Sequence, residues 1–380
     1  MKVELTKIKE IIKKISIVYG AASNFNLLAV DASVDAKTIY FNLYNGEGFV
    51  SFKLPQEDID TDFEATVDTK AFIDIVGSLT AEEISLSVKD SVLKISSGKS
   101  NYKLAMVYDG SEIWRPTFMI ANTPETEVNI STEILNSIDL VNTQELSRVR
   151  EDRIKNGAGK LYYLSNNGCF TSANNYGACL NSFQLDTNCE LLLNKNIVKL
   201  FKLFKDGVIL THEESIVNSV PQVKITLRDD LTLVTMLAPA DKTIRAAMLK
   251  MVYKLKEFAS AIYQTHLIIN AKDLASALSR LNIAAKHSNK AKDEYSRLNI
   301  QIVDNSLTIS DTFENSEVVD LEENSLTINT QIIRLCLEDI KPVVDLCKAE
   351  TIELDTNTHG IVVISFDNIK YFLTQLAPEK

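Results

Sequence analysis

The sequence has few of the features that assign a chain to a membrane or secreted class at first sight. No run approaches the roughly 18 consecutive apolar residues that a membrane-spanning helix needs. Residues 1–10, "MKVELTKIKE", alternate charged and aliphatic side chains and contain no apolar block of the signal-peptide kind. The sequence therefore predicts a cytoplasmic protein.

Cysteine and histidine are scarce and poorly spaced for chemistry. The 5 cysteines form an odd set without a CxxC pair, which is typical of reduced, mostly buried thiols. None of the 4 histidines has a second histidine or a cysteine at metal-ligand spacing. We therefore expect neither a metal site nor a cofactor.

Catalytic motifs are also missing. The sequence contains no GxSxG or HExxH, and "NGAGKL" (156–161) is only a fragment of a phosphate-binding loop. The sequence thus predicts a protein that is not an enzyme. One alternative stays open, a hydrolase that uses Glu213 or the aspartates of "AVDASVDAK" (29–37).

What the sequence does contain is an internal repeat. A short β-prone stretch runs into a helix-capping residue and then into apolar residues at helical spacing. The six candidate caps, at intervals of 62, 63, 63, 76 and 59 residues, are Thr6, Asp68, Ser131, Asn194, Asn270 and Asn329. The helices expected after them cover 7–19, 69–79, 132–142, 195–206, 271–287 and 330–341. The long interval contains 241–264, an extra helical-looking segment that we interpret as an inter-domain connection.

The stretches between these helices alternate β-branched or aromatic residues with polar ones, as strands do. Each repeat is therefore one helix with about four strands, an α+β unit too small for a secure core of its own. Pairing the units predicts three tandem domains, with boundaries 1–123, 124–245 and 246–380.

Charge is sorted between the expected helices and the rest of the chain. The net charge is −11, yet the six helices sum to +6, which leaves −17 for strands and loops. Lysines without aromatic platforms suit phosphate contacts more than base reading. If these lysines bind nucleic acid through its phosphates, the binding should be independent of sequence and strongly dependent on salt.

Over essentially its whole length, the chain resembles the bacterial replicative sliding clamp, the β subunit of DNA polymerase III. The most specific stretches are "TVDTKAFIDIVGSL" (66–79), "LKISSGKSNYKLAM" (93–106) and the closing "YFLTQL" (371–376). The level is that of a divergent relative, of the kind carried by a phage or plasmid.

The resemblance implies three clamp-type domains, each of two β-α-β-β-β units. A head-to-tail homodimer would close a ring, with helices lining the hole and sheets outside. Such a ring is a non-catalytic processivity factor that encircles DNA and tethers the replicative polymerase. The DNA-facing candidates are Lys9, Lys13, Lys199, Lys202, Lys272 and Arg280.

The resemblance also implies two protein interfaces. Tyr102 and Leu104 of an edge strand would meet the partner subunit near Ile283. Polymerase and clamp loader would insert short hydrophobic motifs into a cleft formed by Gly177, Leu180, Pro239, Arg245, Phe372, Thr374 and Leu376.

This cleft departs from the family pattern. Residues 374–376 replace a common Met-Pro-Met pattern, and "NNYGAC" (174–179) replaces the usual Asp-Gly-His-Arg turn. A reshaped cleft with a different peptide preference is expected.

A second alternative to the sliding-clamp function also stays open. It is a structural repeat protein that assembles through its edge strands.

Overall fold

The computed structural model describes most of the chain. The described residues are 1–380 except 22–24, 46–47, 117–125, 132–133, 135–137, 139–160, 174–176, 187–189, 205–207, 218–219, 240–241, 262, 264, 289–295, 304, 323–325, 328–331, 357–359 and 378–380. No helix among them is long and apolar enough to cross a membrane.

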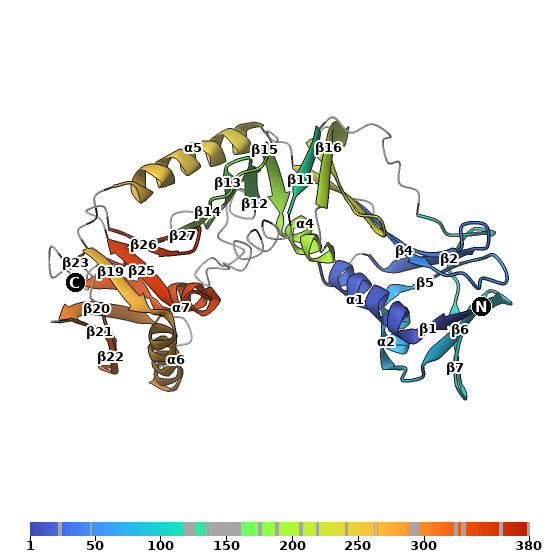
Figure 1. Ribbon diagram of the computed structural model, residues 1–380, viewed down its shortest axis with the longest axis horizontal. Helices are drawn as coiled ribbons and strands as arrows, with labels where there is room; N and C mark the ends of the chain where they lie inside the picture. The colour runs from blue at the N-terminus through green and yellow to red at the C-terminus, as the bar shows by residue number, and fades with distance from the viewer. Residues whose placement is uncertain are drawn as a thin grey trace. The chain divides into compact units, whose positions relative to one another are not determined.

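The first third of the chain contains two β-α-β-β-β units (Figure 1). The first is β1 (Lys2–Glu4), α1 (Leu5–Ala21), β2 (Leu27–Ser33), β3 (Thr38–Tyr44) and β4 (Gly48–Pro55). The second is β5 (Phe63–Asp68), α2 (Thr69–Ser78), β6 (Glu83–Lys89), β7 (Val92–Ser97) and β8 (Ser100–Ala105), followed by the short β9 (Tyr108–Asp109) and β10 (Glu112–Ile113).

The middle third repeats the strand pattern. The third unit shows β11 (Thr126–Ile130), β12 (Leu161–Ser165), β13 (Gly168–Ala173) and β14 (Gly177–Asn181). Most of its expected helix, 132–142, lies outside the described residues. The fourth unit is β15 (Glu190–Asn194), α4 (Lys195–Leu200) with the 3₁₀ turn η3 (Phe201–Leu203), β16 (Val208–Val217), β17 (Val220–Arg228) and β18 (Thr232–Pro239).

The last third completes the series. The fifth unit is β19 (Thr265–Asn270), α6 (Ala271–Ser288), β20 (Arg297–Val303), β21 (Ser306–Asp311) and β22 (Ser316–Asp320). After β23 (Leu326–Thr327), the sixth is β24 (Ile333–Cys336), α7 (Leu337–Leu346), β25 (Thr351–Thr356), β26 (Ile361–Phe366) and β27 (Ile369–Thr374). The expected α+β class and the repeated unit are confirmed.

Several predicted caps are correct. The Asp68 carboxylate accepts a hydrogen bond of 2.7 Å from the backbone N–H of Ala71, and the Asn270 side chain accepts one of 3.0 Å from that of Lys272. The Ser131 hydroxyl accepts from the N–H of Ile134 at 3.3 Å. These side chains satisfy N–H groups that a helix start leaves free.

Two helix starts were predicted wrongly. The first helix begins at Leu5, so Thr6 is a helical residue and not a cap. The sixth begins at Leu337, where 330–341 had been expected, because Ile333–Cys336 forms a strand paired antiparallel with β20. Asn329 itself lies outside the described residues. The residue at the N-cap position is Cys336, 66 residues after Asn270, and its side chain makes no capping hydrogen bond.

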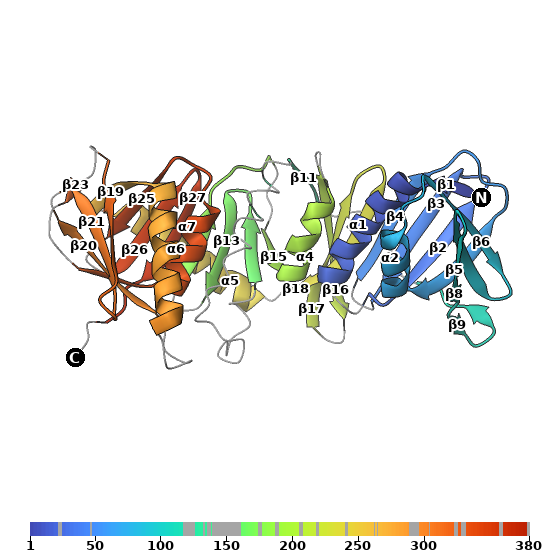
Figure 2. The same cartoon turned by 90° about the horizontal axis from the view of Figure 1, so that it is seen from below.

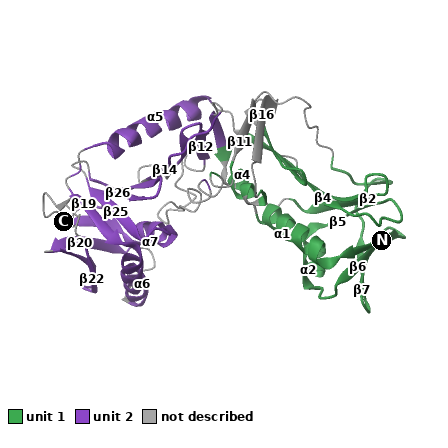
Figure 3. Cartoon of the chain, viewed as in Figure 1, with its two compact units in different colours: residues 1–136, 193–241 green, residues 137–192, 242–380 purple. Residues whose placement is uncertain are grey.

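Contacts divide the chain into two compact units, 1–136 with 193–241 (unit 1) and 137–192 with 242–380 (unit 2) (Figure 3). Unit 1 contains an 8-stranded sheet in which β18 pairs with β4. Unit 2 contains a 9-stranded sheet in which β14 pairs with β27. The middle third is thus shared between two continuous sheets, and the three-domain boundaries stay a prediction.

Helices cover these sheets in different ways. In unit 1, α1, α2 and α4 lie on one face of the strands, and α1 packs against both others (Figure 2). In unit 2, α6 and α7 pack together on one face, whereas α5 (Lys242–Ala259) lies on the opposite face (Figure 1). The extra segment therefore contains a helix, Lys242–Ala259, that covers a sheet, and is not merely a connection.

Candidate functional site

Unit 1 presents basic residues on the helical face of its sheet. On α1, Ile8, Ile12 and Ile15 are buried against the strands, whereas Lys13 is exposed. On α4, Ile197 and Val198 are buried and Lys199 is partly exposed. The structure describes the backbone of Lys202 only. The α1–α4 contact brings Lys13 and Lys199 onto one helical layer.

Two other lysines of α1 have structural partners. The Lys9 ammonium donates to the backbone carbonyl of Leu79 at 2.6 Å, directly beyond the end of α2. The Lys14 ammonium donates to the Thr232 hydroxyl at 2.9 Å and lies 5.9 Å from the centre of the Phe52 ring. A cation on a helix-terminal carbonyl stabilises the helix end, so Lys9 joins two helices.

In unit 2, α6 presents the remaining two DNA-facing candidates. Lys272 is exposed in the first turn. Arg280 donates two parallel hydrogen bonds of 2.8 Å to the Glu317 carboxylate on β22. The Glu317 pKa is lowered, chiefly by this hydrogen bond. The pair is solvent-accessible, and the Glu317 carboxylate compensates the charge of Arg280.

The charge sorting is only partly reproduced by the described helices. Counting their charged residues gives +3 for α1, +3 for α4 with η3, and +2 for α6. However, α7 has three acidic residues and one lysine, a net charge of −2. The most basic described helix is α5, with five basic residues and one glutamate, and it lies on the opposite face of its sheet from α6 and α7.

Each unit has a strand edge suited to pairing with another chain. β8 ends the sheet order β1-β6-β7-β8, and β22 ends the order β22-β21-β20-β24. On β8, Tyr102 is partly exposed and Leu104 is buried. Near β22, Ile283 of α6 is 59% exposed and Val318 of the strand is 62% exposed. Val318 was not foreseen from the sequence, because its exposure depends on which strand ends the sheet.

The predicted cleft residues on β14 and β27 lie on paired strands. The register places Ala178 opposite Phe372 and Gly177 opposite Leu373. Thr374 is the last residue of β27, and Leu376 follows it, partly buried. Pro239 ends β18, which belongs to unit 1, whereas β14 and β27 belong to unit 2. Its position relative to those strands is therefore not defined.

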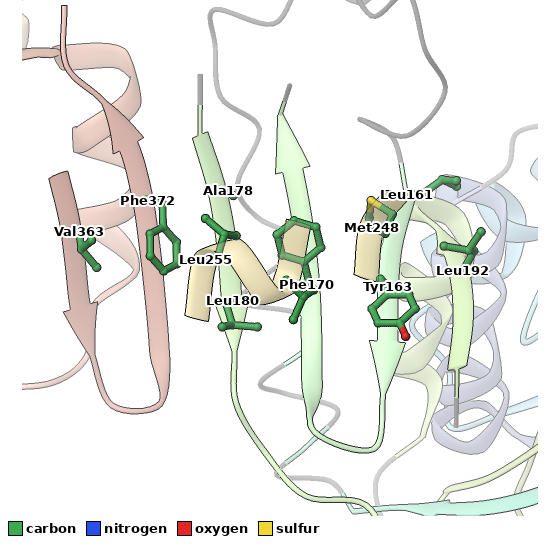
Figure 4. Packing of buried hydrophobic residues seen from close by; sticks show 11 residues of the cluster. Leu161, Tyr163, Phe170, Ala178, Leu180, Leu192, Met248, Leu255, Val363 and Phe372 are labelled. Carbon is green, nitrogen blue, oxygen red and sulfur yellow. The ribbon is translucent and has the colours of Figure 1, made fainter. Parts of the chain in front are cut away.

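These strands form a surface that α5 covers. Leu180 and Phe372 belong to a buried apolar cluster with Tyr163 and Phe170 of the sheet, and Met248, Val252 and Leu255 of α5 complete it (Figure 4). Leu180 is 4% exposed and Phe372 is 3% exposed. Leu180 and Phe372 therefore lie together, but beneath a helix of the same chain, whereas Thr374 is exposed.

One polar group of α5 lies unsatisfied in this region. The Arg245 Nε is buried without a hydrogen-bond partner among the described residues. Burial and the neighbouring Glu190 carboxylate raise the pKa of Tyr163 well above its usual value, and the nearby Arg245 opposes that shift. A buried donor without an acceptor costs free energy, so the packing of α5 on this surface is incomplete.

Comparison with known proteins supports one fold. No family model and no curated protein matches the chain. Solved structures do match over full length. The DNA polymerase III β subunit of Thermotoga maritima has a TM-score of 0.75 at 14% identity, covering 100% of this chain and 99% of its own. The Bacillus subtilis sliding clamp has a TM-score of 0.74 at 12% identity, with coverage of 100% and 99%. The Helicobacter pylori β clamp bound to a DNA ligase peptide has a TM-score of 0.74 at 12% identity, with 99% of both chains covered.

This chain has the sliding-clamp fold. The matches confirm the expected architecture along the whole chain, including the tandem order of the repeated α+β units. At 12–14% identity they do not by themselves assign individual residues, so the DNA-facing, dimer and cleft residues stay predictions.

One polar cluster of this sliding-clamp fold was missed from the sequence. His266 and Asp355 are cross-strand neighbours on β19 and β25, and the His266 Nδ1 lies 2.6 Å from an Asp355 carboxylate oxygen. Glu353 brings a third possible ligand atom within 4.8 Å. Burial raises the pKa of Asp355, while the His266 hydrogen bond opposes that shift. Residues about 90 positions apart cannot be paired from sequence without the strand register.

Proposed function

We propose that this protein is a DNA sliding clamp, a non-catalytic processivity factor that encircles double-stranded DNA and tethers a replicative polymerase. The observation that carries the proposal is the match to DNA polymerase III β subunits over 99–100% of both chains. The basic faces of α1, α4 and α6 support it, because sequence-independent binding requires charge facing phosphates.

The active form would be a head-to-tail homodimer. Two strand edges on different parts of one chain suit this arrangement, since a heterologous interface that closes makes a ring. β8, with Tyr102 and Leu104, would pair with β22 of the second copy, and exposed Ile283 and Val318 would be covered. Closure would also remove edges that otherwise promote aggregation.

The remaining assignments follow from the same proposal. The chain would comprise three domains, 1–123, 124–245 and 246–380, and would act in the cytoplasm without a cofactor. Polymerase and clamp loader would bind through short hydrophobic peptides at the surface of β14 and β27. The Helicobacter pylori clamp, which is bound to a DNA ligase peptide, supports this kind of partner.

The deciding experiment compares retention on circular and linear DNA. Protein loaded onto nicked circular DNA should remain bound in high salt and be lost once the DNA is cut, because only a topological link resists screening. Equal loss from both forms would contradict encirclement and favour ordinary electrostatic binding. Hydrolysis of the DNA during the assay would favour the enzyme alternative. Assembly into open polymers without DNA would favour the structural repeat protein.

Reversal of charge on the helical face tests the DNA contacts. Lys13→Glu with Lys199→Glu should lower the affinity for DNA and flatten its salt dependence by about 0.9 in log–log slope per lost phosphate contact. Lys53→Glu with Lys224→Glu is the matched control, because these lysines alternate with residues buried under the helices and so lie on the other face of the same sheet. An equal loss in both proteins would show that the helical layer is not the DNA surface.

A further inference from the structure

The helix α5 stands outside the repeat that builds the rest of the molecule. It occupies the one long interval between helix caps, between the fourth and fifth units. The helices α6 and α7 belong to repeated units and lie on one face of the unit 2 sheet, whereas α5 lies on the other (Figure 1). The repeat does not require this helix, so its contacts need a separate explanation.

The surface that α5 covers is apolar and continuous. Phe170, Leu180 and Phe372 come from three neighbouring strands, β13, β14 and β27. Without α5 they would form an exposed, contiguous apolar patch, and such patches are a feature of surfaces that bind protein segments. The apolar side of an amphipathic helix fits such a groove through residues at helical spacing. Met248, Val252 and Leu255 supply this spacing.

The packing of α5 against the sheet is incomplete. Ile244, Leu249 and Phe258 are only partly buried against the cluster. The buried Arg245 Nε of α5 finds no partner among the described residues. Water would satisfy it once α5 detached, which lowers the cost of exposing the apolar surface.

We propose that α5 is an intramolecular occupant of the partner-peptide surface and competes with partner peptides for it. The inference rests on the proposed function, since Leu180 and Phe372, which α5 covers, are among the predicted cleft residues. A partner peptide binds only molecules from which α5 has detached. Its apparent affinity is therefore reduced by the fraction of molecules in that state. The partner that fits is a short apolar segment that covers Phe170, Leu180 and Phe372 in place of α5.

Weakening α5 tests the proposal directly. The probe is the labelled DNA ligase peptide that binds the Helicobacter pylori clamp. The variant combines Met248→Ser, Val252→Ser and Leu255→Ser, which removes the apolar side of α5. Fluorescence anisotropy should show at least about tenfold tighter binding to the variant than to the unaltered protein. Unlabelled peptide 242–259 should displace the probe from the variant.

The matched control changes the exposed side of the same helix. Lys250→Ser, Tyr253→Ser and Lys254→Ser alter three exposed residues and should leave the affinity unchanged. Equal affinity of the triple apolar variant and the unaltered protein, or failure of peptide 242–259 to displace the probe, would overturn the proposal. Absence of binding to a variant that keeps its circular dichroism spectrum would overturn it too.

A second measurement, on the unaltered protein, tests the proposal even if the triple apolar variant does not fold. In the unaltered protein, saturating ligase peptide should speed amide hydrogen exchange in α5 and leave α6 unchanged, because only α5 is displaced. Unchanged exchange in α5 would refute the competition.

Retention on circular DNA separates the clamp function from the role of α5. Peptide competition without retention would reject the clamp function alone, and retention without competition would reject the role of α5 alone.

Discussion

Single residues in this protein are constrained by neighbours that the sequence does not reveal. Lys9 and Arg280 read as free basic residues on helix faces. In the structure the first donates to the carbonyl of Leu79, and the second forms a two-point pair with Glu317. Their partners are 70 and 37 positions away, and only the fold brings them together. Helical spacing predicts which face a residue occupies, but not what it meets there.

Gly168 is a position where glycine is required. Its φ is +139°, and a Cβ there would lie 2.2 Å from the carbonyl oxygen of Asn181. Gly168→Ala should therefore destabilise the protein by about 1–3 kcal/mol in urea unfolding, since backbone must move. Gly77→Ala in α2 is the control, because a Cβ there meets nothing within 4 Å. Equal stability of the two variants would contradict this account.

Asp355 gives a pH dependence whose sign can be stated. Burial raises its pKa in the folded protein, so the folded state binds the proton more tightly than the unfolded state. Stability from this group is present below the unfolded pKa of about 3.9 and is lost as pH rises through the folded value. Asp355→Asn should remove this loss.

Thermal unfolding measures the effect. The Tm of Asp355→Asn relative to the unaltered protein should increase as pH rises from about 4 to about 6. Glu353→Gln, at an exposed neighbour in the same cluster, is the control and should show a smaller change. A relative Tm that decreases over this interval would mean that the His266 pair, and not burial, governs the Asp355 carboxyl.

At the scale of elements, the sequence predicted most helices and strands because their apolar periods are distinct. The β3 strand alternates between partly exposed and buried positions throughout, as strict period-2 patterning requires. The start of α7 failed because "IIRLCLEDI" is compatible with either period. Pairing of β24 with β20 decided the outcome, and Leu335 is buried as part of the strand.

The role of α5 could not be predicted for a different reason. Its helical period was visible in 241–264, but an amphipathic helix does not specify which surface it covers. That information is in the apolar cluster to which β12, β13, β14 and β27 contribute, from residues 161 to 372. The predicted cleft residues Leu180 and Phe372 were thus expected to be neighbours, but their burial under α5 was not expected.

The joint between α1 and α2 offers a test at this scale. Lys9→Met removes the hydrogen bond to the carbonyl that follows α2, and should cost about 1–2 kcal/mol of stability. Lys13→Met, one turn further on the same helix and exposed, should change stability by less than about 0.5 kcal/mol. Denaturant unfolding with both variants decides it. A larger loss for Lys13→Met would refute a structural role for Lys9.

At the scale of the whole molecule, the proposed ring depends on two strand edges. Val318→Asp places a charge on exposed β22 and should convert the dimer to a monomer, because an uncompensated carboxylate would be buried in the interface. Light scattering after size exclusion measures the mass. The monomer should also lose its retention on circular DNA.

Val303→Asp is the matched control for this prediction. Val303 is 51% exposed and lies at the end of β20, an inner strand of the same sheet. The control should remain a dimer. A dimer that survives Val318→Asp would place the interface elsewhere, and a dimer lost in both variants would point to general destabilisation of that sheet.

The pairings β18–β4 and β14–β27 have a consequence for how the chain can be divided. Residues 124–245 share a ladder of backbone hydrogen bonds with the segment before them and another with the segment after. A fragment of residues 124–245 would expose the unpaired edges of both sheets to solvent. Such edges pair with one another between molecules and cause aggregation. Recombination or truncation at those boundaries should therefore yield insoluble pieces. The three parts of the chain are therefore expected to be inherited together.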